Sequence, residues 1–85
     1  MLQRMGQLAE KVKARRAELN LSQVSLGAKI GLADAKSYVS RIENSGLIPN
    51  RSRLSDLEQA LNFVAGELQD AALFDEQARH AQASA

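Results

Sequence analysis

Apolar side chains recur at helical spacing along most of this 85-residue chain. In residues 2–19, Leu8 and Val12 lie on one side and charged residues on the other, which predicts an amphipathic first helix. Asn20 follows, and asparagine tolerates the left-handed backbone conformation in which many helices end. Ser22 is the expected N-cap of a second helix, because its hydroxyl can accept a hydrogen bond from a free backbone N–H.

The second and third predicted helices are short and are separated by a glycine. Leu26 and Ile30 repeat at helical spacing until Gly31 interrupts the pattern, which predicts a second helix of about nine residues. Asp34 is the expected cap of the third helix, because a carboxylate suits the positive end of the helix dipole. The apolar stripe of this third helix, which we expect to face the core, consists of Ala35, Val39 and Ile42.

Residues 44–50 are rich in asparagine, glycine and proline, which predicts a surface loop. Asn50 or Ser52 then caps a fourth helix, Asn62 is its expected left-handed terminator, and we expect Phe63 to fill the core just beyond. The expected buried side of this fourth helix consists of Leu54, Leu57, Ala60 and Leu61. With one further helix near the C-terminus, the sequence predicts an all-α fold, a compact bundle of about five helices.

Residues 64–80 favour that last helix, and its apolar positions are Leu68, Leu73 and Phe74. A core built from four short helices has limited room to cover these side chains, and exposed apolar patches usually mark an interface. We therefore expect the three residues to form a homodimer interface. The alternative is that the last helix folds back and buries them within one subunit.

Composition excludes several classes of protein and site. The chain has no cysteine, so it can form neither a disulfide nor a thiolate metal site, and its one histidine, His80, has no second imidazole near it. We find no nucleophile with its base, no carboxylate pair in a predicted pocket and no phosphate-binding glycine loop, and we expect no enzyme, cofactor or metal. No apolar run resembles a signal peptide or the ~20 residues of a membrane span, and we expect a soluble, cytoplasmic protein.

The net charge of +1 conceals a separation of charge along the chain. Residues 1–53 contain ten basic and four acidic side chains, a net charge of +6, and residues 54–85 contain one basic and six acidic side chains, a net charge of −5. This distribution fits a surface that binds a polyanion, joined to an acidic segment that binds a protein partner or is simply solvated. An ordinary solvated surface explains the same charges.

Two short helices around a glycine-containing turn, residues 22–44, are typical of a helix-turn-helix, whose second helix enters the major groove of DNA. If the apolar stripe faces inward, the outer surface of the third helix is donor-rich and contains no carboxylate before Glu43. It consists of Ser37, Ser40, Arg41 and Asn44, with Lys36 and Tyr38 at its margins. Arginine and lysine suit guanine acceptors, and serine, asparagine and tyrosine suit phosphate oxygens. From spacing alone, an ordinary solvated helix face is the better explanation of Lys36, Ser37 and Arg41, and the Tyr38 ring can pack on the domain edge instead.

Residues 13–23, with the sequence KARRAELNLSQ, and residues 40–44, with the sequence SRIEN, together with Pro49 and Leu54, resemble the Cro and lambda-repressor type of helix-turn-helix regulators, the XRE family. The resemblance implies a lambda-repressor-like DNA-binding domain. Residues 31–40 form a segment about two residues longer than the family pattern, which leaves the helix start open between Asp34 and Lys36.

This resemblance also implies roles for individual residues. It implies a DNA backbone contact by Gln23. It also favours interpreting the outer side of the third helix as a DNA surface, and we expect base contacts by Lys36, Ser37 and Arg41 and further backbone contacts by Tyr38, Ser40, Asn44, Arg51 and Arg53. It further implies that Arg16 pairs with Glu43 and ties the first helix to the third. The alternatives are that Gln23 merely completes a helix N-terminus and that the pair is an exposed one of small energy.

The sequence therefore predicts residues 1–68 as a helix-turn-helix DNA-binding domain and residues 69–85 as a helical extension. The expected function is that of a repressor that binds an inverted-repeat, double-stranded DNA operator as a homodimer. The alternative is an antitoxin-like or other protein-interaction module, in which the acidic C-terminal segment binds a protein partner and DNA binding is secondary.

Overall fold

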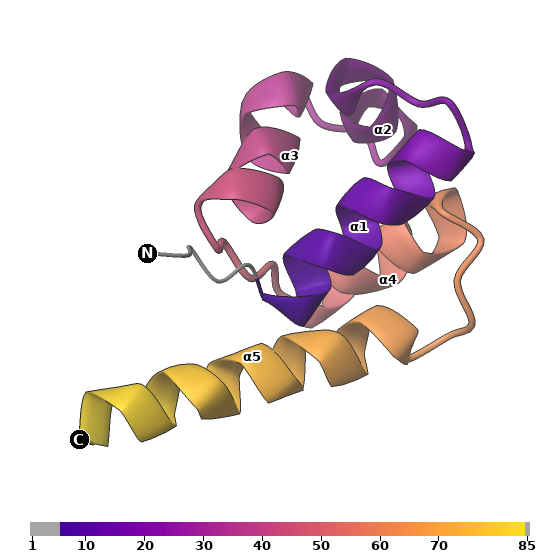
Figure 1. Ribbon diagram of the computed structural model, residues 1–85. Helices are drawn as coiled ribbons and strands as arrows, with labels where there is room; N and C mark the ends of the chain where they lie inside the picture. Colours follow the sequence, from indigo (N-terminus) through magenta and orange to yellow (C-terminus); the bar gives the residue numbers. More distant parts are fainter. Residues whose placement is uncertain (1–5, 85) are drawn as a thin grey trace.

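The computed structural model describes the backbone of residues 6–84 and, apart from Ala35, the side chains of residues 6–78. The described chain is all-helical, as the sequence predicts (Figure 1). Its helices are α1 (Gln7–Glu18), α2 (Gln23–Lys29), α3 (Ala35–Asn44), α4 (Arg51–Ala60) and α5 (Glu67–Ser84). Helices α1 to α4 form a compact group, and α5 runs along one side of this group and extends past it.

Two of the predicted N-caps are confirmed. The Ser22 hydroxyl accepts a hydrogen bond from the Ser25 amide at 3.0 Å, and the Asn50 side chain accepts one from the Arg53 amide at 2.9 Å. Asn50 rather than Ser52 is therefore the cap of α4. Asp34 occupies the N-cap position of α3, as predicted, but its side chain makes no cap hydrogen bond. Its backbone, with φ −102° and ψ 64°, departs from the extended conformation of a capping residue.

The predicted left-handed residues end their helices. Asn20 and Asn62 have φ of 58° and 60°, and Gly31 has φ of 79°. At the end of α2 the Leu32 amide donates to the Gly27 carbonyl at 3.1 Å, which closes the helix as a Schellman motif. This closure makes α2 seven residues long instead of about nine.

Helix α1 begins at Gln7, later than the sequence predicts. Residues 2–5 of the expected first helix lie outside the described residues. Gly6 precedes α1 in an extended conformation, with φ −75° and ψ 165°. A Cβ atom on Gly6 would lie 2.6 Å from Asp75 Oδ2 on α5, so a larger residue at this position would displace the Asp75 carboxylate.

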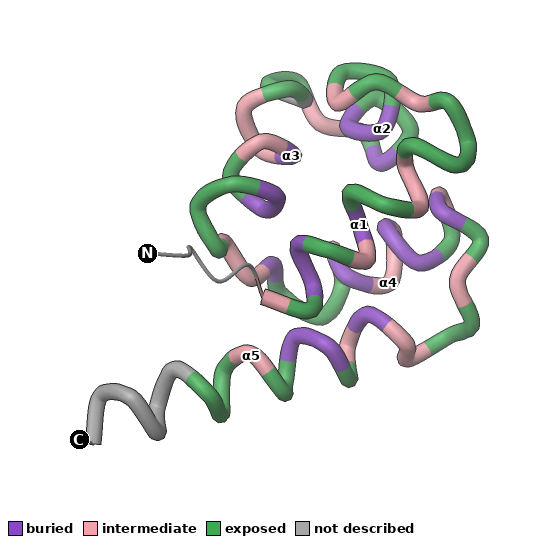
Figure 2. Tube along the Cα trace, viewed as in Figure 1, coloured by how far each residue is buried: buried purple, intermediate pink, exposed green. Residues whose placement is uncertain are grey.

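Every helix contributes apolar side chains to one core. Figure 2 marks buried positions along each helix. The buried cluster consists of Leu8, Val12, Leu26, Ile30, Val39, Ile42, Leu54, Leu57, Leu61, Leu68, Ala71 and Ala72. Val39 and Ile42 are buried as predicted. The side chain of Ala35, the third residue of the predicted stripe, is outside the described residues. Phe63 packs against the edge of the core, where the Arg15 guanidinium lies 4.3 Å from the centre of its ring.

Helix α5 is part of this core rather than an extension that begins at residue 69. Leu68 is fully buried, and Ala71 and Ala72 lie beside it at i+3 and i+4 on the same face. The expectation that Leu68 lies in an exposed patch is therefore wrong, because it points into its own subunit. Leu73 and Phe74 lie on other sides of the helix and are each 54% exposed.

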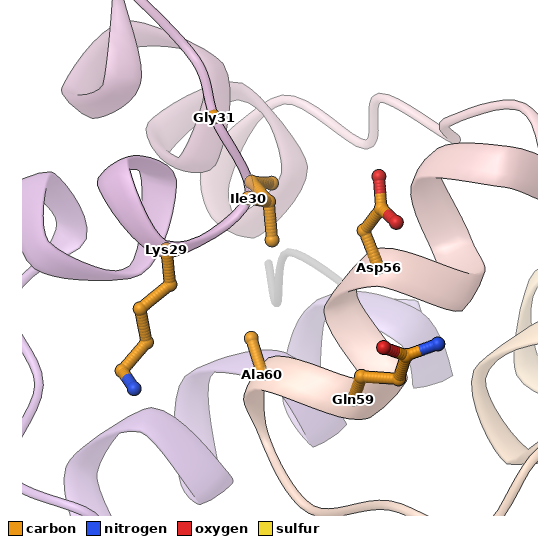
Figure 3. A pocket seen from close by; sticks show the side chains of 6 residues that line it. All are labelled: Lys29, Ile30, Gly31, Asp56, Gln59 and Ala60. Atoms are coloured by element: carbon orange, nitrogen blue, oxygen red, sulfur yellow. The ribbon is translucent and has the colours of Figure 1, made fainter.

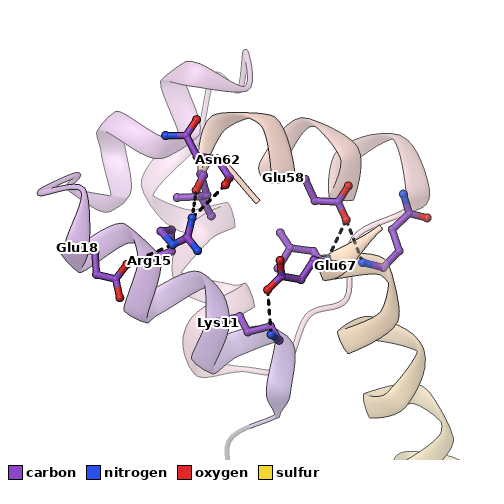
Figure 4. Close-up of polar contacts among 9 residues, drawn as sticks. Lys11, Arg15, Glu18, Glu58, Asn62 and Glu67 are labelled. Carbon is purple, nitrogen blue, oxygen red and sulfur yellow. Dashed lines mark hydrogen bonds and ion pairs between the residues drawn. The ribbon is translucent and has the colours of Figure 1, made fainter. Parts of the chain in front are cut away.

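Carboxylates fix α5 to the other helices (Figure 4). The Glu58 side chain on α4 is buried and accepts hydrogen bonds from the amides of Leu68 and Gln69 at 2.9 and 3.2 Å. Lys11 on α1 forms an ion pair with Glu67 at 3.2 Å. Carboxylates are favourable at helix N-termini, and here one of them joins the end of α4 to the start of α5.

Asp75 on α5 makes the corresponding contact with the start of α1. Its two carboxylate oxygens accept hydrogen bonds from the amides of Gln7 and Leu8 at 2.9 and 3.0 Å. The N-termini of α1 and α5 are thus both capped by side chains of other helices, Asp75 of α5 and Glu58 of α4. These contacts hold the first half of α5 at both ends.

Candidate nucleic-acid interface

Helices α2 and α3 pack closely against each other and are joined by a turn at residues 30–34. Leu26 from α2 and Val39 from α3 are fully buried in the shared core. The turn owes its direction to Gly31, whose positive φ lets the chain leave α2 sharply. Two helices in this arrangement form a helix-turn-helix unit.

The residues that the sequence predicts as base contacts are on α3, two of them fully at its surface. Lys36 and Arg41 are exposed, and Ser37 is half-buried. The helix begins at Ala35, so Lys36 and Ser37 lie in its first turn and Arg41 lies in its second half. Side chains at the start of a recognition helix are the ones that reach base edges in this class of motif.

Three of the predicted backbone contacts also lie on α3. Asn44 is exposed and donates a hydrogen bond from Nδ2 to Ser40 Oγ at 3.1 Å, which orders both side chains on one face. Tyr38 is half-buried, and its ring packs against the edge of the core. Burial raises the pKa of the Tyr38 phenol, and the positive charge of nearby Arg53 acts in the opposite direction.

Arg16 on α1 and Glu43 on α3 form a bidentate ion pair. Arg16 Nε lies 2.7 Å from Glu43 Oε2, and Arg16 Nη2 lies 3.0 Å from Glu43 Oε1. The Glu43 side chain is only 1% exposed, which distinguishes the pair from an exposed one of small energy. The hydrogen bond to Glu43 raises the pKa of the Arg16 guanidinium, although burial opposes this.

Gln23, at the first position of α2, joins the same cluster. Its Nε2 donates to Glu43 Oε1 at 3.2 Å, and Arg16 Nη1 donates to the Leu21 carbonyl at 2.9 Å. Helices α1, α2 and α3 therefore meet at one buried carboxylate. A primary amide has a second N–H, so Gln23 can bind Glu43 and a phosphate oxygen together.

The two arginines of α4 differ in their surroundings. Arg51 is exposed at the first position of the helix. Arg53 is half-buried, and its Nη1 donates to the Ile30 carbonyl at 2.8 Å. Reasoning from the sequence missed this contact, because no local pattern connects positions 23 residues apart.

Among the described residues, no cluster of three or more histidine, aspartate or glutamate side chains could hold a metal ion. None of the described helices combines the length and apolar character needed to cross a membrane.

A helix-turn-helix family model matches residues 12–67, about two thirds of the chain. The chain belongs to this helix-turn-helix family, of the XRE type. It is a family of DNA-binding regulators and generally not of enzymes. The comparisons with curated proteins and with solved structures return no significant match.

The helix-turn-helix match ends at Glu67, the first residue of α5. The core of this XRE-type domain nevertheless continues through Leu68 to Ala72. The compact unit therefore extends beyond the part of the chain that the family describes. The exposed residues Leu73 and Phe74 follow directly.

Proposed function

We propose that this XRE-type regulator is a sequence-specific transcriptional repressor that binds an inverted-repeat DNA operator as a homodimer. The observation that carries the proposal is the exposed, donor-rich face of α3 in a helix-turn-helix. Lys36 and Arg41 provide its cations, and the buried Arg16–Glu43 pair fixes the helix that bears them. A rigid recognition helix loses little entropy on binding, which favours discrimination between sequences.

In this proposal α3 lies in the major groove, where Lys36, Ser37 and Arg41 contact base edges. Arginine binds guanine O6 and N7 through two parallel hydrogen bonds, so Arg41 is the expected main source of base preference. The phosphate backbone is contacted by the remaining polar residues of the surface. These are Gln23, Tyr38, Ser40, Asn44 and Arg51.

The proposed dimer forms through the exposed apolar residues of α5. Leu73 and Phe74 follow the buried segment of α5, and the helix extends beyond the rest of the domain (Figure 1). Pairing two short recognition helices doubles the length of DNA that is recognised, and the half-sites would lie about 34 Å apart. Leu68 does not contribute to this interface, because it is buried in its own core.

Binding to DNA is tested with an operator selected from random duplexes and with a scrambled duplex of the same length. Arg41→Ala is expected to cost about 1–3 kcal/mol on the operator and to relax preference at one base pair. Lys13→Ala is the matched control, because Lys13 is an exposed cation on α1, outside the helix-turn-helix. An equal loss on both duplexes would show that Arg41 contributes charge alone.

Dimer formation is tested by sedimentation at micromolar concentration. Phe74→Asp is expected to yield a monomer and to weaken binding to the full operator far more than to a single half-site, because the dimer would have to bury a charge. Val64→Asp is the matched control, since Val64 is 74% exposed in the α4–α5 loop. A monomeric wild type, whose operator binding rises only with the first power of protein concentration, would refute the dimer.

A second candidate function is that of an antitoxin-like protein-interaction module with secondary DNA binding. The observation that favours it is the exposed pair Leu73 and Phe74, flanked on α5 by the exposed acidic residues Asp70 and Glu76. Such a surface suits a basic protein partner. Salt-dependent binding of duplex DNA by the purified protein alone favours the repressor, and binding only after addition of a second protein favours this alternative.

A further inference from the structure

Arg53 connects α4 to the end of α2. It lies in the first turn of α4, where its amide donates to the Asn50 cap. Its guanidinium extends away from this helix, and Nη1 lies 2.8 Å from the carbonyl oxygen of Ile30. The same nitrogen lies 3.5 Å from Asp56 Oδ2, one turn further along α4.

Ile30 is the C-cap residue of α2, at the point where the chain turns toward α3. Carbonyl groups at a helix C-terminus lack intrahelical partners and carry the negative end of the helix dipole. A cationic donor is therefore favourable there. The following residues, Gly31 and Leu32, close α2 through hydrogen bonds to Ala28 and Gly27, each of 3.1 Å.

The Ile30 side chain is buried in the same core cluster as Leu54 and Leu57 of α4, and Arg53 adds a polar contact to the backbone of this turn. The end of α2 and the middle of α4 face each other across an open hollow of about 450 Å³ (Figure 3). Lys29 and Gly31 lie on one side of the hollow, and Asp56 and Gln59 lie on the other. The side chains around the hollow leave it open, so the hydrogen bond from Arg53 to the Ile30 carbonyl is a further restraint on the turn, in addition to the burial of the Ile30 side chain.

The charge of Arg53 also acts on the phenol of Tyr38, a residue of α3 that packs against the core. Arg53 therefore contacts the end of α2 and acts electrostatically on a residue of α3, while belonging to neither helix. About a third of the Arg53 side chain is exposed, and Arg51, two positions earlier, is exposed.

We propose that Arg53 is a positioning residue, which holds the α2–α3 turn from α4 through the Ile30 carbonyl and so fixes the direction of α3, rather than a phosphate ligand. The proposal rests on the DNA-binding function proposed above and adds a role for α4 in it. Arg51, which makes no such contact, is then the phosphate ligand of this helix.

The first test uses the free protein, without DNA. Amide hydrogen exchange is measured at Gly31 and Leu32, whose hydrogen bonds close α2. Arg53→Met retains the apolar stem of the side chain and removes its donors, and it is expected to accelerate exchange at both amides. Arg51→Met removes a neighbouring charge of the same kind, and it is expected to leave both exchange rates unchanged.

The second test is the salt dependence of operator binding. Each phosphate contact contributes about one unit to the slope of log K against log salt concentration. Arg53→Met is expected to weaken binding by about two- to fivefold, the range for a cation at a helix C-terminus, with an unchanged slope. Arg51→Met is expected to flatten the slope by about one unit.

A flattened slope for Arg53→Met, with wild-type exchange at Gly31 and Leu32, would overturn the proposal. Arg53→Lys guards against a methionine variant that fails to fold. Lysine lacks the rigid planar fork of arginine, so exchange faster than in the wild type is expected at both amides. Wild-type exchange in that variant contradicts the proposal. A wild type that binds no DNA refutes the proposed function, and the exchange experiment still decides the role of Arg53.

Discussion

Removing Arg16 tests whether the buried ion pair anchors the recognition helix. Arg16→Met retains the aliphatic part of the side chain and removes the three hydrogen bonds that Arg16 donates to Glu43 and Leu21. The Glu43 carboxylate, only 1% exposed, then retains the Gln23 amide as its hydrogen-bond donor among the described residues. The perturbation therefore leaves a buried charge without its counter-charge.

The expected cost follows from this burial. Breaking a buried ion pair by removing one partner costs about 3–5 kcal/mol, whereas an exposed pair is worth less than about 1 kcal/mol. The Arg16 side chain is 18% exposed, and Gln23 still donates to Glu43, so we expect a loss of about 3 kcal/mol. Such a loss is a large fraction of the stability of a domain of this size.

The assay is urea unfolding of Arg16→Met, of Glu43→Met and of the double variant, with Lys13→Met as an exposed control on the same helix. The double variant is expected to be more stable than the sum of the single losses predicts, because it buries no unpaired charge. A coupling energy near zero, or a loss in Arg16→Met no greater than in Lys13→Met, would refute the reasoning. The pair would then be no structural tie between α1 and α3.

Three further predictions concern stability. Glu58→Ala leaves the buried amide of Leu68 without its acceptor, and it is expected to lower the free energy of unfolding by about 1–3 kcal/mol in urea. Glu58→Gln retains an acceptor and is expected to cost less. Equal losses in the two variants would contradict the capping role. Asp75→Ala removes the cap of α1 and is expected to cost about 0.5–2 kcal/mol, with faster amide exchange at Leu8, and unchanged exchange there would count against it. Burial raises the pKa of Tyr38, so its contribution to stability is present in full below about pH 10 and is lost as pH rises through the folded-state pKa. Tyr38→Phe is expected to reduce this loss of stability at alkaline pH. The wild type has one tyrosine, so its tyrosinate absorbance gives the pKa of Tyr38 in the folded protein directly. A pKa at or below the ordinary value would refute the prediction.

The helix caps and helix ends could be predicted from the sequence alone, because they depend on neighbouring residues. Ser22 and Asn50 cap their helices, and Asn20 and Asn62 end theirs, through hydrogen bonds and backbone angles within a few positions. Helical periodicity likewise predicted that Val39 and Ile42 of α3 are buried. These positions can be predicted because a capping side chain bonds to the backbone a few residues away, and a left-handed residue turns the backbone at its own position. Asp34 shows the limit of this reasoning, since it occupies the N-cap position but its side chain makes no cap hydrogen bond.

Contacts between side chains far apart in the sequence could be identified only from the tertiary structure. Leu68 and Phe74 have similar apolar character in the sequence, yet the path of α5 buries the first and exposes the second. The partners of Arg53 and Asp75 lie 23 and 68 residues away, and no local pattern encodes such distances. Their pairing depends on the relative placement of whole helices, which is set by packing of the complete core and by the need to satisfy buried polar groups. For that reason the sequence predicted Arg53 only as a cation near DNA, and the structure placed its guanidinium against the turn of the helix-turn-helix.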